Sequence, residues 1–444
     1  MQAIGIAGCI FATVFLIFTV YKGYHIAYMS IVCALIIVLT NQMNLVEAFS
    51  STFVTGASRC ANMWFYFVFG VTMAELYGKS GAGQSIARTV IRTFCKPGSS
   101  PKKRRAVGIL SIYMVGVLML FGGFEAGALP FILLPIATAI CAESDIPRRF
   151  MPGLLLGTAA TIGSTTPGSP QAHNQIASSI LGTPTTAALI PGLIASVVVA
   201  LCINLYMNWA IARDNNKGIH FDYGPLPQAD EDDPNKRPHF ILSILPLLSI
   251  FILYNFAGLH LYLCMLFANV FSLVLFWKYF EGGHLAVRSF IRTALTRSGG
   301  MLLVMASFQG FSAVFSASPS FQPMLGGLVK ISAGHGALFA LILAMALIAV
   351  TSGNAPSALT FGLPILGPIY TGMGVSASAV HRVAIFAAVT LDTLPTNGGI
   401  LFMLEMCGVD MKDGYPAVGM NTVVCTGIGA IVCALLCTLF PGLA

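Results

Sequence analysis

The stretch MLFGGFEAGALPFILLP, residues 119–135, places two adjacent glycines, a glutamate and two prolines inside a long apolar region. Breaks of this kind in a membrane helix leave backbone N–H and C=O groups without their usual partners. In lipid such groups persist only where protein or a wet cavity supplies new partners. An acidic side chain at this depth is costly, and its default explanation is a function. The stretch therefore predicts a broken membrane helix beside a functional site, with Glu125 as the acidic group.

The composition of the whole chain is that of an integral membrane protein. Of the 444 residues 56% are apolar and 9% are charged, and the mean hydropathy is +0.83. A helix needs about 20 apolar residues to cross the hydrocarbon, whereas alternating barrel strands are about ten residues long. We therefore predict an all-α polytopic membrane protein with roughly ten to twelve membrane elements, some of them re-entrant. The runs without Asp, Glu, Lys or Arg that support this prediction are 3–21, 150–212, 298–329, 336–380 and 414–444.

Basic residues are concentrated in one short loop. Seven basic residues and no acid occur from Arg88 to Arg105. By the positive-inside rule this loop is cytoplasmic, and counting spans backward puts the amino terminus outside. Binding of nucleic acid is not expected, because a short basic loop between spans normally sets orientation and no stacking aromatic residues accompany it.

The eleven cysteines are scattered through apolar segments, with no CxxC pair and no His/Cys cluster. This pattern indicates buried reduced thiols rather than a disulfide framework or a zinc site. We expect neither a metal nor another cofactor.

A hydrophilic linker, 213–238, divides the chain into the halves 1–212 and 239–444. Each half contains, in the same order, a glycine-containing break, a proline-punctuated apolar helix, an arginine-bearing turn, another apolar helix and a polar Pro/Gly tip. Aligning Pro135 with Pro364 sets Glu125 on Asn354, while the two tips correspond only after a gap. An odd number of spans in the first half would invert the second, as in inverted-repeat transporters.

Four breaks are predicted, at about 122–130, 163–171, 352–357 and 394–399. Broken helices that meet near the middle of a membrane form solute sites. Because most Lys and Arg residues lie in loops or near helix ends, helix N-termini would take the place of cations in binding an anion.

Polar and glycine residues of these breaks are the predicted substrate contacts. Hydroxyl groups in membrane helices also bond backbone carbonyls or join helices, and this alternative stays open for each of them. The predicted substrate-binding residues are Gly123, Ser164, Thr165, Thr166, Gly168, Ser169, Asn354, Ser357, Thr396, Asn397 and Gly398.

Glu125 and Asp392 are the predicted ion-coupling residues. Desolvation favours the neutral form of a buried acid, so such a group can take up a proton on one side of the membrane and release it on the other. The alternatives are a protonated Glu125 bonded to freed backbone and an Asp392 that only caps a helix locally.

Three further residues are possible participants. His173 follows the first tip and could shuttle protons or bind solute. His381 and Arg382 follow serines suited to an N-cap, which predicts a first helical turn near an interface. Snorkelling is then the expected role of Arg382, with substrate contact as the alternative.

Two regions carry a resemblance to a known family. The segment GGFEAGALPFILLPIATAI, followed by GSTTPGSP, resembles the gluconate permease family. In the second half, SGNAPSALTFGLPIL and HRVAIFAAVTLDTLPTNGGILFMLEMCG resemble the hydroxybutyrate permease-like branch, in which HR, LD, LP and NG recur in this order. The positions that match family motifs are Glu125, Pro167, Gly168, Asp392, Pro395 and Asn397.

The resemblance implies a bacterial inner-membrane secondary transporter for small hydroxylated carboxylates, commonly coupled to protons. It also implies a dimeric, elevator-type carrier built from inverted repeats. Where relatives often carry histidine, this chain has Thr166 and Thr396, which leaves the substrate open.

Together these features predict a symporter whose partners are a small organic anion, H⁺, the lipid bilayer and a second copy of the chain. A Na⁺-coupled carboxylate transporter is the alternative. A membrane-embedded enzyme is disfavoured, since no nucleophile–base–orienter set or metal-ligand set is found. A passive channel is disfavoured by the paired tips.

Overall fold

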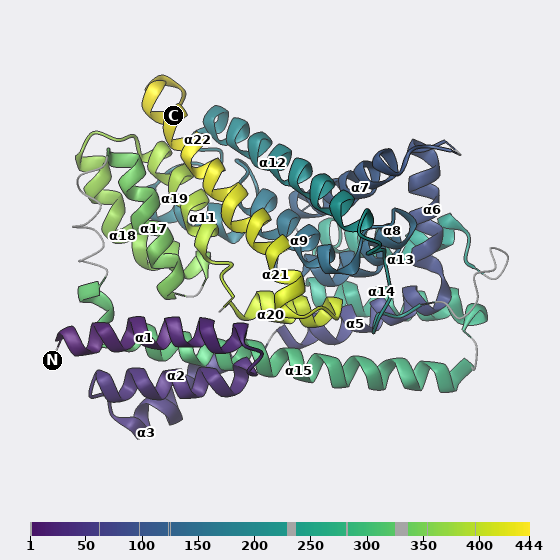
Figure 1. Cartoon of the computed structure of the whole chain (residues 1–444), viewed down its shortest axis with the longest axis horizontal. Coiled ribbons are helices and arrows are strands. Elements are labelled where there is room, and N and C mark those ends of the chain that lie inside the picture. The colour runs from purple at the N-terminus through teal and green to yellow at the C-terminus, as the bar shows by residue number, and fades with distance from the viewer. Residues whose placement is uncertain are drawn as a thin grey trace.

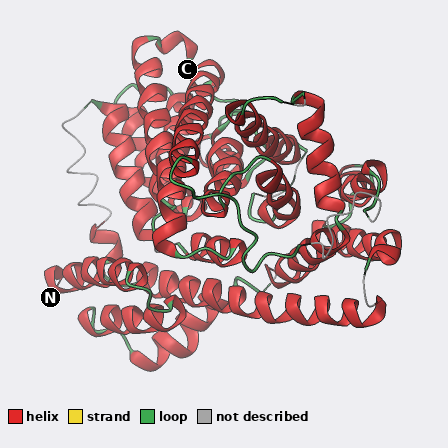
Figure 2. Ribbon diagram, turned by 45° about the vertical axis from the view of Figure 1, so that its right-hand side comes forward, coloured by secondary structure: helices red, strands yellow, loops and turns green. Residues whose placement is uncertain are grey.

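The computed structural model describes residues 2–61, 63–96, 98–122, 124, 126–228, 237–280, 283–324, 336–352, 354–395 and 397–444. Within these ranges every regular element is a helix, and no strand occurs (Figure 2). Six of the described helices are long and apolar enough to cross a membrane. The predicted all-α polytopic class is confirmed. Gly123, Glu125, Thr396 and residues 229–236 of the linker lie outside the described residues.

The first half contains long membrane helices and a group of short elements near its end. Its elements are α1 Gln2–Tyr21, α2 Ile26–Thr40, α3 Leu45–Glu47, η1 Ala48–Phe53, α4 Val54–Ser58, α5 Met63–Ser80, α6 Ala82–Phe94, α7 Pro101–Phe121, α8 Leu129–Glu143, η2 Arg148–Phe150, α9 Met151–Leu156, η3 Gly157–Ile162, α10 Gly163–Thr165, α11 Ala172–Leu181 and α12 Leu189–Asn215.

The second half follows the linker and has fewer, longer elements. They are α13 Phe240–Asn255, α14 Leu261–Phe276, η5 Trp277–Tyr279, α15 Gly283–Ala317, α17 Ala337–Ser352, α18 Ala355–Gly372, α19 Ala377–Leu391, α20 Gly398–Cys407, α21 Met411–Gly419, η6 Met420–Val424, α22 Cys425–Leu439 and η7 Pro441–Leu443.

The helices pack as groups around the two tips. In both views α1 and α2 lie along the long helix α15 on one side of the molecule, and α2 packs on both of the others (Figures 1 and 2). On the opposite side α12 and α22 cross the molecule side by side (Figure 1). Between these sides α17, α18 and α19 form one packed group, while α5, α6 and α7 surround α8.

Helices end at all four predicted breaks. Residues 122–128, with 123 and 125 outside the description, separate α7 from α8, and α18 begins three residues after the end of α17 at Ser352. We name residues 166–171, between α10 and α11, the first tip, and residues 392–397, between α19 and α20, the second tip. Local sequence explains the new starts, since Pro130 and Pro356 occupy the first turns of α8 and α18.

Several helix boundaries of the first half recur in the second half at a single shift of 226 residues. Met151, Gln171 and Gly182 stand 226 positions before Ala377, Asn397 and Gly408, which are the corresponding helix start, N-cap and left-handed C-cap. The same shift sets the first residue of α8 on that of α18. This register differs by three residues from the one that aligns Pro135 with Pro364, and α18 is three residues longer than α8. The tips then correspond without a gap.

All eleven cysteines are free thiols, and ten of them are buried, as their apolar surroundings predict. The described part of the linker packs on the first half. Arg148 binds Asp222 at 2.9 Å, and Arg149 forms an ion pair with the buried Asp214.

Candidate functional site

A cavity of about 170 Å³ lies where the second tip meets the helices that flank the first tip. It draws residues from both halves of the chain, including Ser164 of α10 and Asn397 of the second tip. Its lining is Phe67, Ala126, Gly127, Pro130, Leu156, Ser164, His173, Met305, Pro356, Asp392, Thr393, Asn397, Gly399, Ile400, Phe402 and Met403. Ser164 and Asn397, 233 positions apart in the sequence, thus share one cavity, and none of the lining residues is Lys or Arg.

Four helix N-termini converge on this cavity. The second residue of each of α8, α11, α18 and α20 lines it, namely Pro130, His173, Pro356 and Gly399. Each helix N-terminus carries a partial positive charge from the aligned peptide dipoles. An anion in the cavity would therefore be stabilised by four helix dipoles without a cationic side chain.

One wall of the cavity is aromatic. Phe402 stacks on Phe131 of α8 with ring centroids 5.1 Å apart, and its ring lies 5.3 Å from that of Phe67. Phe67 and Phe402 line the cavity directly. Apolar walls limit water entry and so strengthen the electrostatic interactions inside.

Side chains of the tips supply hydrogen bonds to the broken backbone. Gln171 Oε1 accepts from the Ala126 N–H at 2.9 Å, and Gln171 Nε2 donates to the Phe124 carbonyl at 2.7 Å. In the second half Asp392 Oδ2 accepts from the Ala355 N–H at 3.3 Å. A side chain of each tip thus bonds backbone groups at the break in its own half. Non-helical backbone at membrane depth needs such partners.

Two buried polar atoms at the cavity have no hydrogen-bond partner among the described residues. They are Oδ1 of Asp392 and Nδ1 of His173. Buried polar atoms are nearly always bonded, so these two atoms retain the capacity for a further hydrogen bond. A carboxylate and an imidazole can both exchange protons or bind a polar solute.

Asn397 and Asn354 act as N-caps of the helices that start at the cavity. Asn397 Oδ1 accepts from the Gly399 N–H at 2.7 Å, while its Nδ2 donates to the Asp392 carbonyl at 2.5 Å. Asn354 Oδ1 accepts from the Ser357 N–H at 2.8 Å. These caps fix the helix starts, and of the two asparagine side chains only that of Asn397 lies in the cavity lining.

The hydroxyl groups of the first tip mostly bond backbone. Thr165 donates to the Thr161 carbonyl, Thr166 to the Ile162 carbonyl at 2.6 Å, and Ser169 to the Gly163 carbonyl. Gly168 has a φ of +77°, which glycine adopts without strain. Of the predicted substrate-binding residues the cavity brings together Ser164 and Asn397, whereas Thr165, Thr166, Gly168, Ser169, Asn354, Ser357 and Gly398 lie outside its lining, and Gly123 and Thr396 outside the described residues.

Arg382 is fully buried, so the expected snorkelling to an interface is wrong. Its guanidinium donates to four oxygens of the first half: the carbonyls of Thr165 at 3.0 Å, Thr185 at 2.7 Å and Ala187 at 3.1 Å, and Asn174 Oδ1 at 2.7 Å. Ser376 is the N-cap of α19 as predicted, but Arg382 sits in the second turn, where it is covered by the segment after α11.

His381 belongs to the same buried network rather than to the cavity. Its Nδ1 lies 2.7 Å from Thr183 Oγ1, and its Nε2 lies 3.4 Å from Asn174 Oδ1. The network joins α19 to α11 and to the start of α12, so it positions the first tip. Among the described residues no group of three or more His, Cys, Asp or Glu side chains could hold a metal ion.

Comparison with protein families gives a match along nearly the whole chain. A family model described as GntP family permease matches residues 3–439. The chain belongs to this family of permeases. The resemblance to gluconate permeases is thus confirmed, and the GntP permease is a multi-pass membrane transporter, in bacteria a protein of the inner membrane.

Individual relatives of this GntP permease are distant. The uncharacterized transporter YxjC of Bacillus subtilis (strain 168) is 23% identical over 474 aligned positions, which cover 95% of this chain and 96% of that protein. Among solved structures, the YdaH transporter of Alcanivorax borkumensis, whose crystal structure shows an unusual topology, is similar over 90% of each chain with 14% identity and a TM-score of 0.37.

Sequence reasoning missed Gln171 and Asn174 of this permease. Both occur in the run PQAHNQ, where Gln171 lies two residues before His173 and Asn174 directly follows it. A polar amide beside a broken helix, in a chain with few polar residues, was the available signal, since freed backbone groups require such partners.

Proposed function

We propose that this GntP permease is a proton-coupled symporter of a small organic anion, with a hydroxylated carboxylate as the substrate class. The observation that carries the proposal is the cavity on which four helix N-termini converge. The carboxylate of the solute would lie at these N-termini, and the Ser164 hydroxyl and the Asn397 amide are within the same lining for its other oxygens.

Asp392 is the proposed proton carrier in the described part of the site. Its Oδ1 has no partner among the described residues, and the cavity lining has no cation that would balance an ionised carboxylate. Protonation of Asp392 removes a negative charge from the neighbourhood of the anionic solute. Proton and solute therefore favour each other's binding, and the coupling must be reciprocal.

Glu125 is the second proposed coupling residue. It precedes Ala126 and Gly127, which line the cavity. Na⁺ is the alternative coupling ion, because a carboxylate oxygen together with backbone carbonyls freed at the breaks is a suitable set of ligands for a hard cation.

The proposed mechanism is alternating access of the elevator type in a homodimer. The halves 1–212 and 239–444 would be inverted repeats joined by the linker 213–238. The single shift of 226 residues between corresponding helix starts supports a repeat. An inverted pair gives the cavity two equivalent routes to the two sides of the membrane.

Transport by purified protein in proteoliposomes tests the proposal. A carrier exchanges labelled for unlabelled solute and accumulates it when a pH gradient is imposed with no Na⁺ present. Chemical conversion of the solute would instead establish an enzyme, and uptake without counterflow a channel. A strict requirement for Na⁺ would replace the proton assignment by the alternative ion.

A further inference from the structure

A second cavity, of about 560 Å³, lies at the junction of α6, α7 and α8, far from the tips in sequence. It contains most of the charge of the basic loop. Its lining is Arg88, Ile91, Arg92, Cys95, Lys96, Gly98, Ser99, Arg104 and Glu143. Four cationic side chains thus face one acidic side chain, a net charge of +3.

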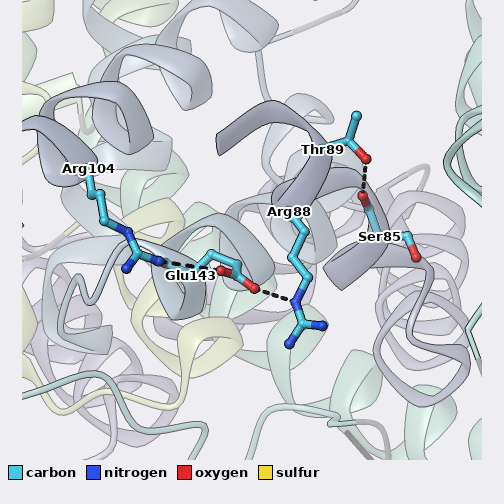
Figure 3. A network of polar contacts seen from close by, with 5 residues as sticks. All are labelled: Ser85, Arg88, Thr89, Arg104 and Glu143. Atoms are coloured by element: carbon cyan, nitrogen blue, oxygen red, sulfur yellow. Dashed lines mark hydrogen bonds and ion pairs between the residues drawn. The ribbon is translucent and has the colours of Figure 1, made fainter. Parts of the chain in front are cut away.

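The single acid of this cavity is already occupied. Glu143 lies between the two arginines, with Oε1 2.5 Å from Arg88 Nε and Oε2 3.6 Å from Arg104 Nη2 (Figure 3). Its backbone carbonyl also accepts from Arg104 Nη2, at 2.8 Å. These contacts fix the two guanidinium groups at the cavity wall.

Arg92 and Lys96 form no ion pair or hydrogen bond with the described residues, and both are exposed. They stand four positions apart, Arg92 in the last turn of α6 and Lys96 two residues after its end. The cavity is thus a concave, positively charged site, and two of its four cations, Arg92 and Lys96, have no acidic partner among the described residues.

We propose that this basic cavity binds a phosphate-bearing anion. Arginine recognises phosphate through paired N–H donors, and lysine binds it as a point charge. The positive-inside rule would be met by basic residues anywhere in the loop. Here four cationic side chains surround one cavity, and Glu143 holds two of them in place, which provides a binding site.

The surroundings favour the headgroup of an anionic phospholipid as the source of the phosphate. The cavity lies at the ends of α6, α7 and α8, and from there α7 continues with exposed Leu110, Met114 and Leu118. Acyl chains could lie along these side chains while the headgroup occupies the cavity. Basic pockets between membrane helices on the cytoplasmic side bind anionic headgroups in this way. Free inorganic phosphate is the other source of the same chemistry.

The test uses the full-length protein in neutral detergent. Lipid binding is followed by native mass spectrometry and by the unfolding temperature, with dioleoylphosphatidylglycerol as probe and dioleoylphosphatidylcholine as the uncharged reference. Inorganic phosphate, compared with chloride at equal ionic strength, is the soluble arm. The cavity variant is Arg92→Gln/Lys96→Gln. The control is Lys102→Gln/Lys103→Gln, which removes two exposed charges from the same loop outside the lining.

We expect phosphatidylglycerol to bind more tightly than phosphatidylcholine, and the cavity variant to weaken that preference by about ten- to thirtyfold, since each basic residue near a membrane surface contributes on the order of fivefold. The control variant should retain the preference. If inorganic phosphate stabilises the wild type but not the cavity variant, and phosphatidylglycerol has no such effect, the cavity binds phosphate from a soluble ligand and the site is supported. Equal losses in the two variants, or no selective binding of either probe, would overturn the proposal. Because both substituted side chains are exposed, the unliganded unfolding temperature should not change.

Discussion

Asp392 Oδ2 accepts a hydrogen bond from the backbone N–H of Ala355 at 3.3 Å, across the break between α17 and α18. The same carboxyl group has its other oxygen buried and without a partner among the described residues. One oxygen therefore stabilises the start of a helix, and Asp392 lines the cavity on which four helix N-termini converge. The first oxygen has a structural contact, and the second is the one to which we assign the proposed coupling role.

Replacing Asp392 with Asn separates these two roles. Asparagine keeps an oxygen that can accept from Ala355 and resembles the protonated acid, but it cannot release a proton. We expect Asp392→Asn to retain counterflow of solute and to lose accumulation driven by a pH gradient, and we expect the same of Glu125→Gln. Uptake and counterflow in proteoliposomes measure both properties. If a variant still accumulates solute as the wild type does, the residue replaced in it does not carry the coupled proton.

Replacing Gln171 with Leu tests whether the first tip holds its break. The change leaves the Ala126 N–H and the Phe124 carbonyl without their partners, so we expect a loss of about 1–3 kcal/mol in the free energy of unfolding. The matched control is Gln175→Leu on the same helix, since Gln175 bonds only the Pro170 carbonyl and is exposed. Denaturation in detergent compares the two. If the two variants are equally stable, water supplies the hydrogen bonds that the Ala126 N–H and the Phe124 carbonyl lose.

Two hydroxyl groups two residues apart test the position of the solute. Ser164 lines the cavity, whereas Thr166 lies outside its lining and donates to the Ile162 carbonyl. We expect Ser164→Ala to weaken solute binding by about 1–3 kcal/mol and Thr166→Val to leave it unchanged. Binding is measured by calorimetry once counterflow has identified the solute. The reverse order of effects would place the solute against the first tip itself.

Inversion of the two repeats predicts opposite membrane sides for the ends of α11 and α20. Under the positive-inside rule the basic loop is cytoplasmic, and Arg148 bonds the Gly408 carbonyl close to the linker, which puts the end of α20 on the same side. Single cysteines at Ser179 and at Asp410, both exposed, should then react with an impermeant maleimide from opposite sides of intact cells. Wild-type protein, whose thiols are buried or half-buried, provides the background. Labelling of both positions from one side would contradict the inversion.

Local sequence was sufficient to predict the four breaks, because glycine, proline and capping residues determine helix ends from their immediate neighbours. It also predicted that helix N-termini would replace cations at the site. It left open whether the hydroxyls of Thr165 and Thr166 bond solute or backbone, and the structure pairs both with carbonyls one turn earlier.

Partners distant in sequence could not be predicted in this way. Gln171 bonds a backbone N–H 45 positions earlier, and Arg382 bonds a carbonyl 217 positions earlier. The charge of Arg382 suggested an interface, since a buried guanidinium is costly unless several oxygens surround it. The oxygens that do so come from α10, α11 and the segment between α11 and α12, and nothing near Arg382 in the sequence indicates them.

The contacts of Arg382 also set an order of events during synthesis. The carbonyls of Thr165, Thr185 and Ala187 leave the ribosome long before the arginine that binds them. At about 5–20 residues per second, the delay for Thr165 is roughly ten to forty seconds. During that interval the nascent first half is already among lipids. Water, lipid or the insertion machinery must then supply hydrogen-bond partners for these three carbonyls. Assembly of the buried network around Arg382 is therefore a late step in biogenesis, completed only after α19 has been synthesised.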